Sequence, residues 1–265
     1  MKKGMLGLTG AMLFMSMFAG AVFAQELTVG QIVEKANLTA YYAGADGLSD
    51  VKMTIKDSQG RTRNREFRIL RFDVQDGGEQ KFYVYFKEPD DIAKMVYMVW
   101  KYLDKDDDRW LYLPALDLVR RIAASDKRSS FVGSHFVYED VSGRGLQADT
   151  HELVETTDDY YKIKNVPVET KGVEFAYYLI WVRKHDFLPF KSEYYDADDQ
   201  LIRSIEALDI RDVQGNPTVM KSVAKDLQRG GETEMEFSNI KYDNEIEDSI
   251  FAERYLRRPP VKWVK

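Results

Sequence analysis

His135, Glu139 and Asp140 are the residues whose types and spacing could do chemistry in this chain. They stand in the stretch Gly-Ser-His-Phe-Val-Tyr-Glu-Asp. An imidazole with two carboxylates is suited to metal binding or to acid–base catalysis. The His-x-x-x-Glu spacing would align on a helix, but residues 136–138 favour an extended segment, which divides the three side chains between two faces. Neither of the other two histidines stands in an acidic cluster with metal-ligand spacing. We therefore predict no catalytic residue and no metal site here.

Other motifs of catalysis are equally weak. Ser134 is not in the Gly-x-Ser-x-Gly pattern of a nucleophile elbow. The acidic run at 104–108 lacks the glycine and the distal glutamate of a calcium loop, so we interpret it as a solvated hairpin tip. The chain has no cysteine, which excludes thiol chemistry, cysteine–zinc sites and iron–sulfur clusters. We expect no enzymatic activity and no cofactor.

The first 24 residues have the pattern of a secretory signal peptide. Lys2 and Lys3 precede an apolar run at 6–18, and Val22-Phe23-Ala24 places small residues at the cleavage positions. The apolar run is too short for a membrane span and is interrupted by Gly and Ser. We predict cleavage after Ala24, a bacterial periplasmic location, and a single domain at 25–265.

Charge and composition narrow the class of partner. Beyond Ala24 the chain has 36 basic and 44 acidic side chains, because Lys2 and Lys3 are the only charged residues before it. A surface with a net charge of −8 argues against nucleic acid, which requires clustered Lys and Arg. Without disulfides, the domain depends on its core for stability.

The elements predicted from the pattern are one helix followed by an antiparallel meander. Thr28 and Gln31 form a capping box, and apolar residues follow at helical spacing. From residue 51 to residue 242, alternating runs separated by Asp, Gly, Asn and Pro predict about ten or eleven strands with hairpin connections. Residues 114–145 lack clean alternation and suit a crossover or lid. We predict a mainly β (α+β) fold, a curved antiparallel half-barrel.

Several strands are apolar on both faces. Tyr83 and Tyr85 lie opposite the face of Phe82, Val84 and Phe86. A strand of this kind needs cover on both sides, and one strong helix does not cover so large a sheet. The mismatch predicts a concave apolar face that bounds a cavity, covered by the N-terminal helix and a lid of helix and loop.

The motifs resemble those of the outer-membrane lipoprotein-sorting (LolA-like) family, in particular the branch found beside RND-type exporters. The resemblance covers nearly all of the chain after residue 24 and rests on Trp110-Leu111-Tyr112-Leu113-Pro114-Ala115, Val119-Arg120-Arg121-Ile122 and Phe131-x-Gly133-Ser134-His135-Phe136-x-Tyr138-Glu139-Asp140. It implies a half-barrel whose concave face holds acyl chains, with no enzymatic activity. His135 stands where the family pattern usually has Asp, and residues 93–96 depart from its Gly-Thr.

These observations together predict a periplasmic carrier of lipid or lipid-modified lipoprotein cargo that passes it towards the outer membrane. The alternative is a non-catalytic adaptor subunit of an RND-type exporter whose sheet is filled by its own side chains. We expect a monomer that binds lipid or acylated lipoprotein and no nucleic acid, with an inner-membrane exporter as a candidate partner. Arg120 and Arg121 are assigned to a rim that meets a headgroup or a partner. The residues expected to line the cavity are Phe82, Val84, Phe86, Met98, Trp100, Trp110, Tyr112, Phe131, Tyr178, Ile180 and Val182.

Overall fold

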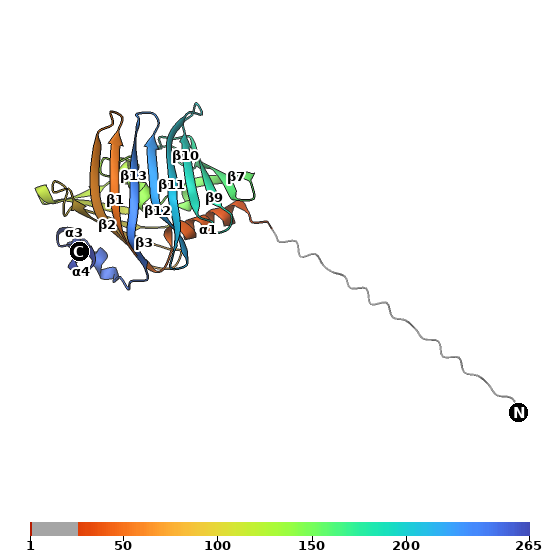
Figure 1. Cartoon of the computed structure of the whole chain (residues 1–265), viewed down its shortest axis with the longest axis horizontal. Helices are drawn as coiled ribbons and strands as arrows, with labels where there is room; N and C mark the ends of the chain where they lie inside the picture. The colour runs from red at the N-terminus through yellow and green to blue at the C-terminus, as the bar shows by residue number, and fades with distance from the viewer. Residues whose placement is uncertain (2–25) are drawn as a thin grey trace.

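The computed structural model describes Met1 and residues 26–265, which form one curved antiparallel sheet with short helical segments around it (Figure 1). The predicted signal peptide lies outside the described residues. The strands are β1 (Asp46–Asp57), β2 (Thr62–Asp73), β3 (Gln80–Glu88), β4 (Val96–Lys101), β5 (Asp108–Leu113), β6 (Leu118–Ile122), β7 (Asp149–Thr156), β8 (Tyr160–Pro167), β9 (Tyr177–Arg183), β10 (Pro189–Tyr195), β11 (Leu201–Val213), β12 (Asn216–Asp226) and β13 (Gly231–Tyr242).

The sheet consists of two meanders joined by one long-range pairing. Its strand order is β6-β5-β4-β3-β2-β1-β13-β12-β11-β10-β9-β8-β7, so every neighbour except the β1–β13 pair is consecutive in sequence. The register sets Met53 of β1 opposite Met235 of β13. Because successive side chains alternate between faces, this register places Val51, Met53 and Ile55 on the same concave side as Met235.

Helix α1 (Val29–Tyr41) covers the concave face at the β7–β9 end of the sheet. The predicted capping box is present: Gln31 N–H donates to the Thr28 hydroxyl at 3.3 Å, and the Gln31 side chain accepts from Thr28 N–H at 2.9 Å. Ile32 and Val33 are buried and pack against Ile163 and Val182 of the sheet. The capping box therefore fixes where the helix begins, and the apolar stripe fixes which face it buries.

A second part of the concave face is covered by the crossover between the two meanders. It follows strand β6 and contains η2 (Ala124–Asp126), α2 (Tyr138–Ser142) and η3 (Leu146–Ala148), whereas η1 (Pro114–Leu116) forms the β5–β6 turn. Residues 123–148, which we call the lid, carry Phe131, Phe136 and Tyr138 into the core above Phe67 and Phe86.

The convex face of strands β2–β5 is covered by the C-terminal segment, which contains η4 (Asp248–Phe251), α3 (Arg254–Arg257) and α4 (Val261–Val264) (Figure 1). Phe251 and Leu256 are fully buried there. Tyr83 Oη donates to the Tyr255 carbonyl at 2.7 Å, and Trp100 Nε1 donates to the Phe251 carbonyl at 2.9 Å. Strands apolar on both faces thus have cover on both sides.

The predicted curved antiparallel sheet is confirmed, but it has thirteen strands instead of about ten or eleven. Strand β6 has no counterpart among the sequence patterns, because it lies in the stretch that lacks clean alternation and most of its side chains are exposed. The cover supplied by the C-terminal segment is also absent from the sequence prediction. None of the helices in residues 26–265 is long and apolar enough to span a membrane.

Candidate functional site

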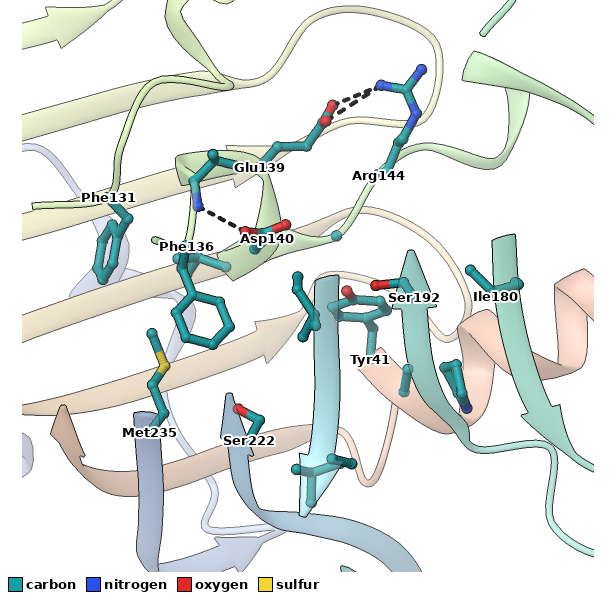
Figure 2. A pocket seen from close by; sticks show the side chains of 18 of the residues that line it. Tyr41, Phe131, Phe136, Glu139, Asp140, Arg144, Ile180, Ser192, Ser222 and Met235 are labelled. Carbon is teal, nitrogen blue, oxygen red and sulfur yellow. Dashed lines mark hydrogen bonds and ion pairs between the residues drawn. The ribbon is translucent and has the colours of Figure 1, made fainter. Parts of the chain in front are cut away.

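A groove of about 860 Å³ lies between the concave face, α1 and the lid (Figure 2). Its volume falls within the range of roughly 300–1,000 Å³ that is typical of ligand sites. The lining is mainly apolar. From the sheet it includes Phe67, Ile69, Phe82, Tyr178, Ile180, Ser192, Ile205, Ala207, Ser222, Met235 and Phe237; from α1 and the lid it includes Val33, Ala36, Ala40, Phe131, Phe136, Val137 and Val141.

Small side chains in the middle of the sheet explain why the groove is not filled from within. Ala207 of β11 pairs with Ser222 of β12, and Ser222 pairs with Met235 of β13. Ser192 of β10, which pairs with Ile205 of β11, also lines the groove and points into it (Figure 2). Side chains of this size do not reach the lid, so the space above them stays open while the bulky β2–β4 end is packed.

The lid is anchored at the β2–β4 end by an aromatic cluster. The Phe131 ring centroid lies 6.1 Å from that of Phe67, 6.0 Å from that of Phe86 and 5.6 Å from that of Tyr97. Tyr138 of α2 adds an edge-to-face contact at 5.6 Å. Such pairs contribute about 0.5–1.5 kcal/mol each beyond area burial. The cluster closes one end of the groove.

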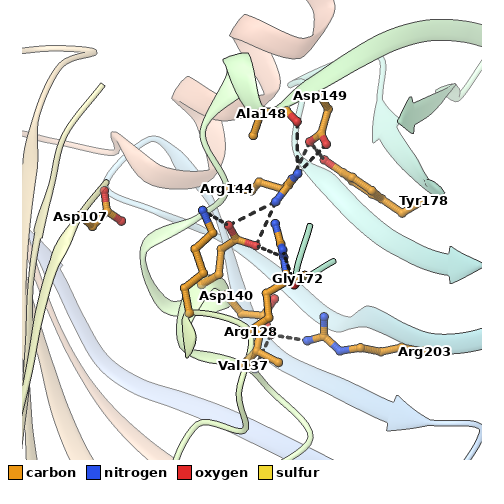
Figure 3. A network of polar contacts seen from close by, with 12 residues as sticks. Asp107, Arg128, Val137, Asp140, Arg144, Ala148, Asp149, Gly172, Tyr178 and Arg203 are labelled. Carbon is orange, nitrogen blue, oxygen red and sulfur yellow. Dashed lines mark hydrogen bonds and ion pairs between the residues drawn. The ribbon is translucent and has the colours of Figure 1, made fainter. Parts of the chain in front are cut away.

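A polar network holds the other side of the lid (Figure 3). Glu139 accepts from Arg128 at 3.3 Å and from Arg144 at 3.3 Å, and it forms an ion pair with Lys127 at 3.8 Å. Arg144 also pairs with Asp149 at the start of β7, with 2.7 Å between Nε and Oδ2. Because these groups are mostly buried, removing one member would leave its partners uncompensated.

Arg203 of β11 ties the lid to the floor of the groove. Its guanidinium donates to Asp140 of α2, whose carboxylate also accepts from Val137 N–H at 2.7 Å. Burial raises the pKa of the Asp140 carboxyl, and the neighbouring Arg203 opposes that rise. The pair couples the position of α2 to a strand that lines the groove.

His135 is part of the contact between the lid tip and the sheet. Its main-chain N–H donates to Thr233 Oγ1 at 3.0 Å, and Nδ1 lies 2.8 Å from the same oxygen. A Cβ on Gly231 would lie 2.7 Å from His135 Nε2, so the ring fits only against a glycine. Burial lowers the pKa of His135. In the part of the chain that the structure describes, no group of three or more His, Cys, Asp or Glu side chains is arranged to hold a metal ion.

Four of the eleven residues predicted to line the cavity lie along the groove: Phe82, Phe131, Tyr178 and Ile180. That they bind a ligand stays a prediction. The other predicted residues of the concave side are packed beneath its covers. Val84 and Phe86 lie in the core with Phe131, and Val182 lies under α1.

The remaining four predicted residues are on the other face, which corrects the sequence assignment. Met98, Trp100, Trp110 and Tyr112 pack against the C-terminal segment. The β3–β4 register pairs Phe82 with Val99 and Val84 with Tyr97, so the odd-numbered residues of β4 face inward. Strands β4 and β5 are apolar on both faces, and for such strands alternation does not tell which face is concave.

Arg120 and Arg121 lie on the edge strand β6, outside the groove lining. Arg121 pairs with Asp108, and its guanidinium lies 5.4 Å from the Trp110 ring centroid on the convex side. Both arginines are exposed. A headgroup or partner role for them stays a prediction, at a different place from the groove rim.

The groove residues that sequence reasoning missed come from β2, β10–β13, α1 and the lid. Ala207 and Ser222 are small residues inside otherwise bulky strands, which is the one signal that could have pointed to them. Their meaning depends on pairing, because only the register brings them side by side.

Comparisons with known proteins support the fold. A family model with the description of an uncharacterized protein matches residues 78–258. A DUF1329 family protein from Desulfovibrio piger is 29% identical, with a TM-score of 0.76, over 85% of this chain and 95% of that one. A domain assigned to the outer-membrane lipoprotein-sorting proteins of Vibrio parahaemolyticus is 24% identical, with a TM-score of 0.78, over 86% and 98%. A LolA superfamily protein from Nitrosomonas europaea is 19% identical, with a TM-score of 0.67, over 87% and 100%. Among curated proteins, none matches the chain.

Proposed function

The chain belongs to the DUF1329 family and has a LolA-like carrier fold, and from the open groove we propose that it carries lipid or lipid-modified lipoprotein cargo towards the outer membrane. The observation that carries this proposal is the mainly apolar groove of about 860 Å³ under the lid. A soluble carrier needs such a space, because each methylene of an acyl chain costs about 0.8 kcal/mol in water.

The groove offers two kinds of surface to such cargo. Ile180, Ile205 and Phe237 provide apolar contact for an acyl chain. Arg128 and Arg203 line the same space, and each is already paired with a carboxylate of α2. Their charge is therefore largely neutralised, which suits a cargo bound through its chain more than through an anionic headgroup.

The proposal places the carrier in the periplasm, in agreement with the signal-peptide pattern and predicted cleavage after Ala24. It requires no cofactor and no catalytic residue. Three structural neighbours of good coverage are of DUF1329, lipoprotein-sorting and LolA types, and a periplasmic location fits that relationship. An inner-membrane RND-type exporter stays a candidate partner.

The alternative, an exporter adaptor with a self-filled sheet, requires a packed interior. The β2–β4 end meets this requirement, because Phe131 and its neighbours fill it. The small residues of β10–β12 do not, and the groove above them favours the carrier.

The test is native mass spectrometry of protein purified without detergent, followed by extraction of bound molecules. A double variant, Ala207→Trp with Ser222→Trp, should block the groove. Leu208→Trp is the matched control, because Leu208 is half exposed on the convex face of the same strand. We expect bound lipid or acylated peptide in the wild type and in the control, and little in the blocked variant. A clean apo mass with no uptake of offered lipids would support the adaptor instead.

A further inference from the structure

Positive charge is concentrated on one part of this acidic protein. Residues 114–121 and 252–265, which we call the basic face, carry seven Lys and Arg side chains and two acidic ones. The rest of residues 26–265 carries 29 basic and 42 acidic side chains. An asymmetry of this size creates a local field opposite in sign to that of the whole molecule.

The two segments form one continuous surface. Arg257 of α3 donates to Asp117 in the β5–β6 turn, at 2.9 Å to the carboxylate and 3.1 Å to the main-chain carbonyl. Val119 of β6 packs in the same cluster as Leu256. Arg68 holds the end of α4 by donating to the Trp263 carbonyl at 3.2 Å. The C-terminal segment is therefore docked beside β6 and is not a loose tail.

Most of the cations in these two segments are free of carboxylate partners among the described residues. No ion pair within 4 Å involves Arg254, Arg258 or Lys262 among the described residues, whereas Arg121 and Arg257 are paired. All three are exposed. Lys262 Nζ lies 4.4 Å from the ring centroid of Trp263, at a half-buried indole. Lysine and arginine beside Trp and Tyr are the combination found at membrane–water interfaces.

Large apolar side chains project from the same surface. Leu116 is 71% exposed, the highest value for a large apolar side chain within residues 26–265, and Val261 of α4 is 58% exposed. Leu116 directly precedes Asp117, the turn residue that Arg257 holds. Exposed apolar side chains surrounded by cations suit insertion between headgroups, where both kinds of contact are made at once.

We propose that the basic face docks the protein on an anionic lipid membrane surface. The remaining surface is acidic and would be repelled by such a membrane, so docking would select one orientation, with the turn at 114–118 and helices α3 and α4 towards the lipid. This surface is separate from the groove, and the inference does not depend on what the groove carries. Of the two arginines assigned from sequence to a headgroup or partner contact, Arg121 lies on this face beside Trp110, whereas Arg120 pairs with Leu111 and points to the lid side of β6.

The experiment is co-sedimentation with vesicles of phosphatidylglycerol and phosphatidylcholine in equal parts, compared with vesicles of phosphatidylcholine alone. The test variant is Arg254→Gln, Arg258→Gln and Lys262→Gln together. The control variant is Lys35→Gln, Lys171→Gln and Lys225→Gln, which removes the same charge from exposed lysines elsewhere that also lack a carboxylate within 4 Å. Thermal melting shows that both variants are folded.

We expect sedimentation only with the anionic vesicles, and a decrease in partitioning as salt rises. Each basic group at an anionic surface contributes roughly fivefold, so the test variant should lose on the order of 100-fold at low salt. Leu116→Ser with Val261→Ser should weaken binding, and Ala207→Trp with Ser222→Trp should leave it unchanged, which separates docking from cargo uptake. Equal losses in the two charge variants would overturn the proposal. The proposal would also be overturned if the folded wild type did not sediment with anionic vesicles. In that case the partner of this face would be an acidic protein surface.

Discussion

Replacing Phe131 with Ala would test how the lid is held closed. Phe131 is 1% exposed and is the one lid residue that contacts both β2 and β3 through aromatic rings, those of Phe67 and Phe86. The substitution removes the ring without touching any polar group of the Glu139 network. The sheet should therefore keep its pairing while the lid loses its apolar anchor.

The expected loss in the free energy of unfolding follows from burial. Truncation of a buried Phe to Ala costs about 3–5 kcal/mol, because both the transfer energy and the cavity contribute. The site is enclosed by four aromatic rings within 6.1 Å, including Tyr97 and Tyr138, which limits its collapse. We expect about 4 kcal/mol, a large share of the roughly 5–15 kcal/mol of a typical domain.

The assay is urea unfolding combined with hydrogen exchange of the lid. Leu208→Ala is the control, because Leu208 is half exposed on the convex face, on the other side of the sheet from the lid. The control should lose about 1 kcal/mol or less and keep lid protection. In the Phe131 variant, amides of 127–142 should exchange faster than those of β1 and β13. A loss below about 1 kcal/mol with unchanged lid protection would refute the anchoring argument.

Three further predictions concern polar groups of the lid and its surroundings. Asp140→Ala should cost about 3–5 kcal/mol in urea unfolding, because it leaves Arg203 buried without its partner, and adding Arg203→Met should recover part of that cost; independent, additive losses would contradict the pairing. Burial lowers the pKa of Lys101 to about 8, so the folded state releases this proton before the unfolded state does. The free energy of unfolding of the wild type relative to that of Lys101→Met should then rise by roughly 3 kcal/mol between about pH 8 and 10.4. If the two proteins instead change in stability with pH in the same way, the lowered pKa of Lys101 is excluded. Burial also lowers the pKa of His135, so stability should fall as pH drops from about 6.5 towards 5, and His135→Gln should remove that fall in urea titrations at each pH.

The sequence predicted a helix, strand or turn well where a single residue type or a single hydrophobic periodicity determines it. The capping box at Thr28 sets the start of α1 because the hydroxyl and the amide satisfy each other's main-chain groups. The hairpins follow from turn residues such as Gly60, whose positive φ of 79° favours glycine. The stretch without alternation became the lid, as expected, although it also contains strand β6.

The lining of the groove could be predicted only in part. Tyr178 and Ile180 lie along the groove as predicted, although β9 also carries apolar side chains, Leu179 and Trp181, on its other face. Trp110 and Met98 were assigned to the wrong face because apolar side chains occupy both faces of their strands. Whether such a side chain faces a groove or a helix depends on what covers it, and the cover here comes from residues more than 130 positions away.

By itself, then, the sequence determined a mainly β chain with one capped helix, no cysteine chemistry, and more apolar strand surface than that helix could cover. Those properties depend on residue type and short-range spacing, which a single sequence contains. Tertiary structure alone decided which surface is hollow. The pairing of β11, β12 and β13 gathers Ala207 and Ser222 under the lid, and the C-terminal segment fills the opposite face. A cavity forms where two segments pack against each other without filling the space between them, so it exists only after segments distant in sequence have come together.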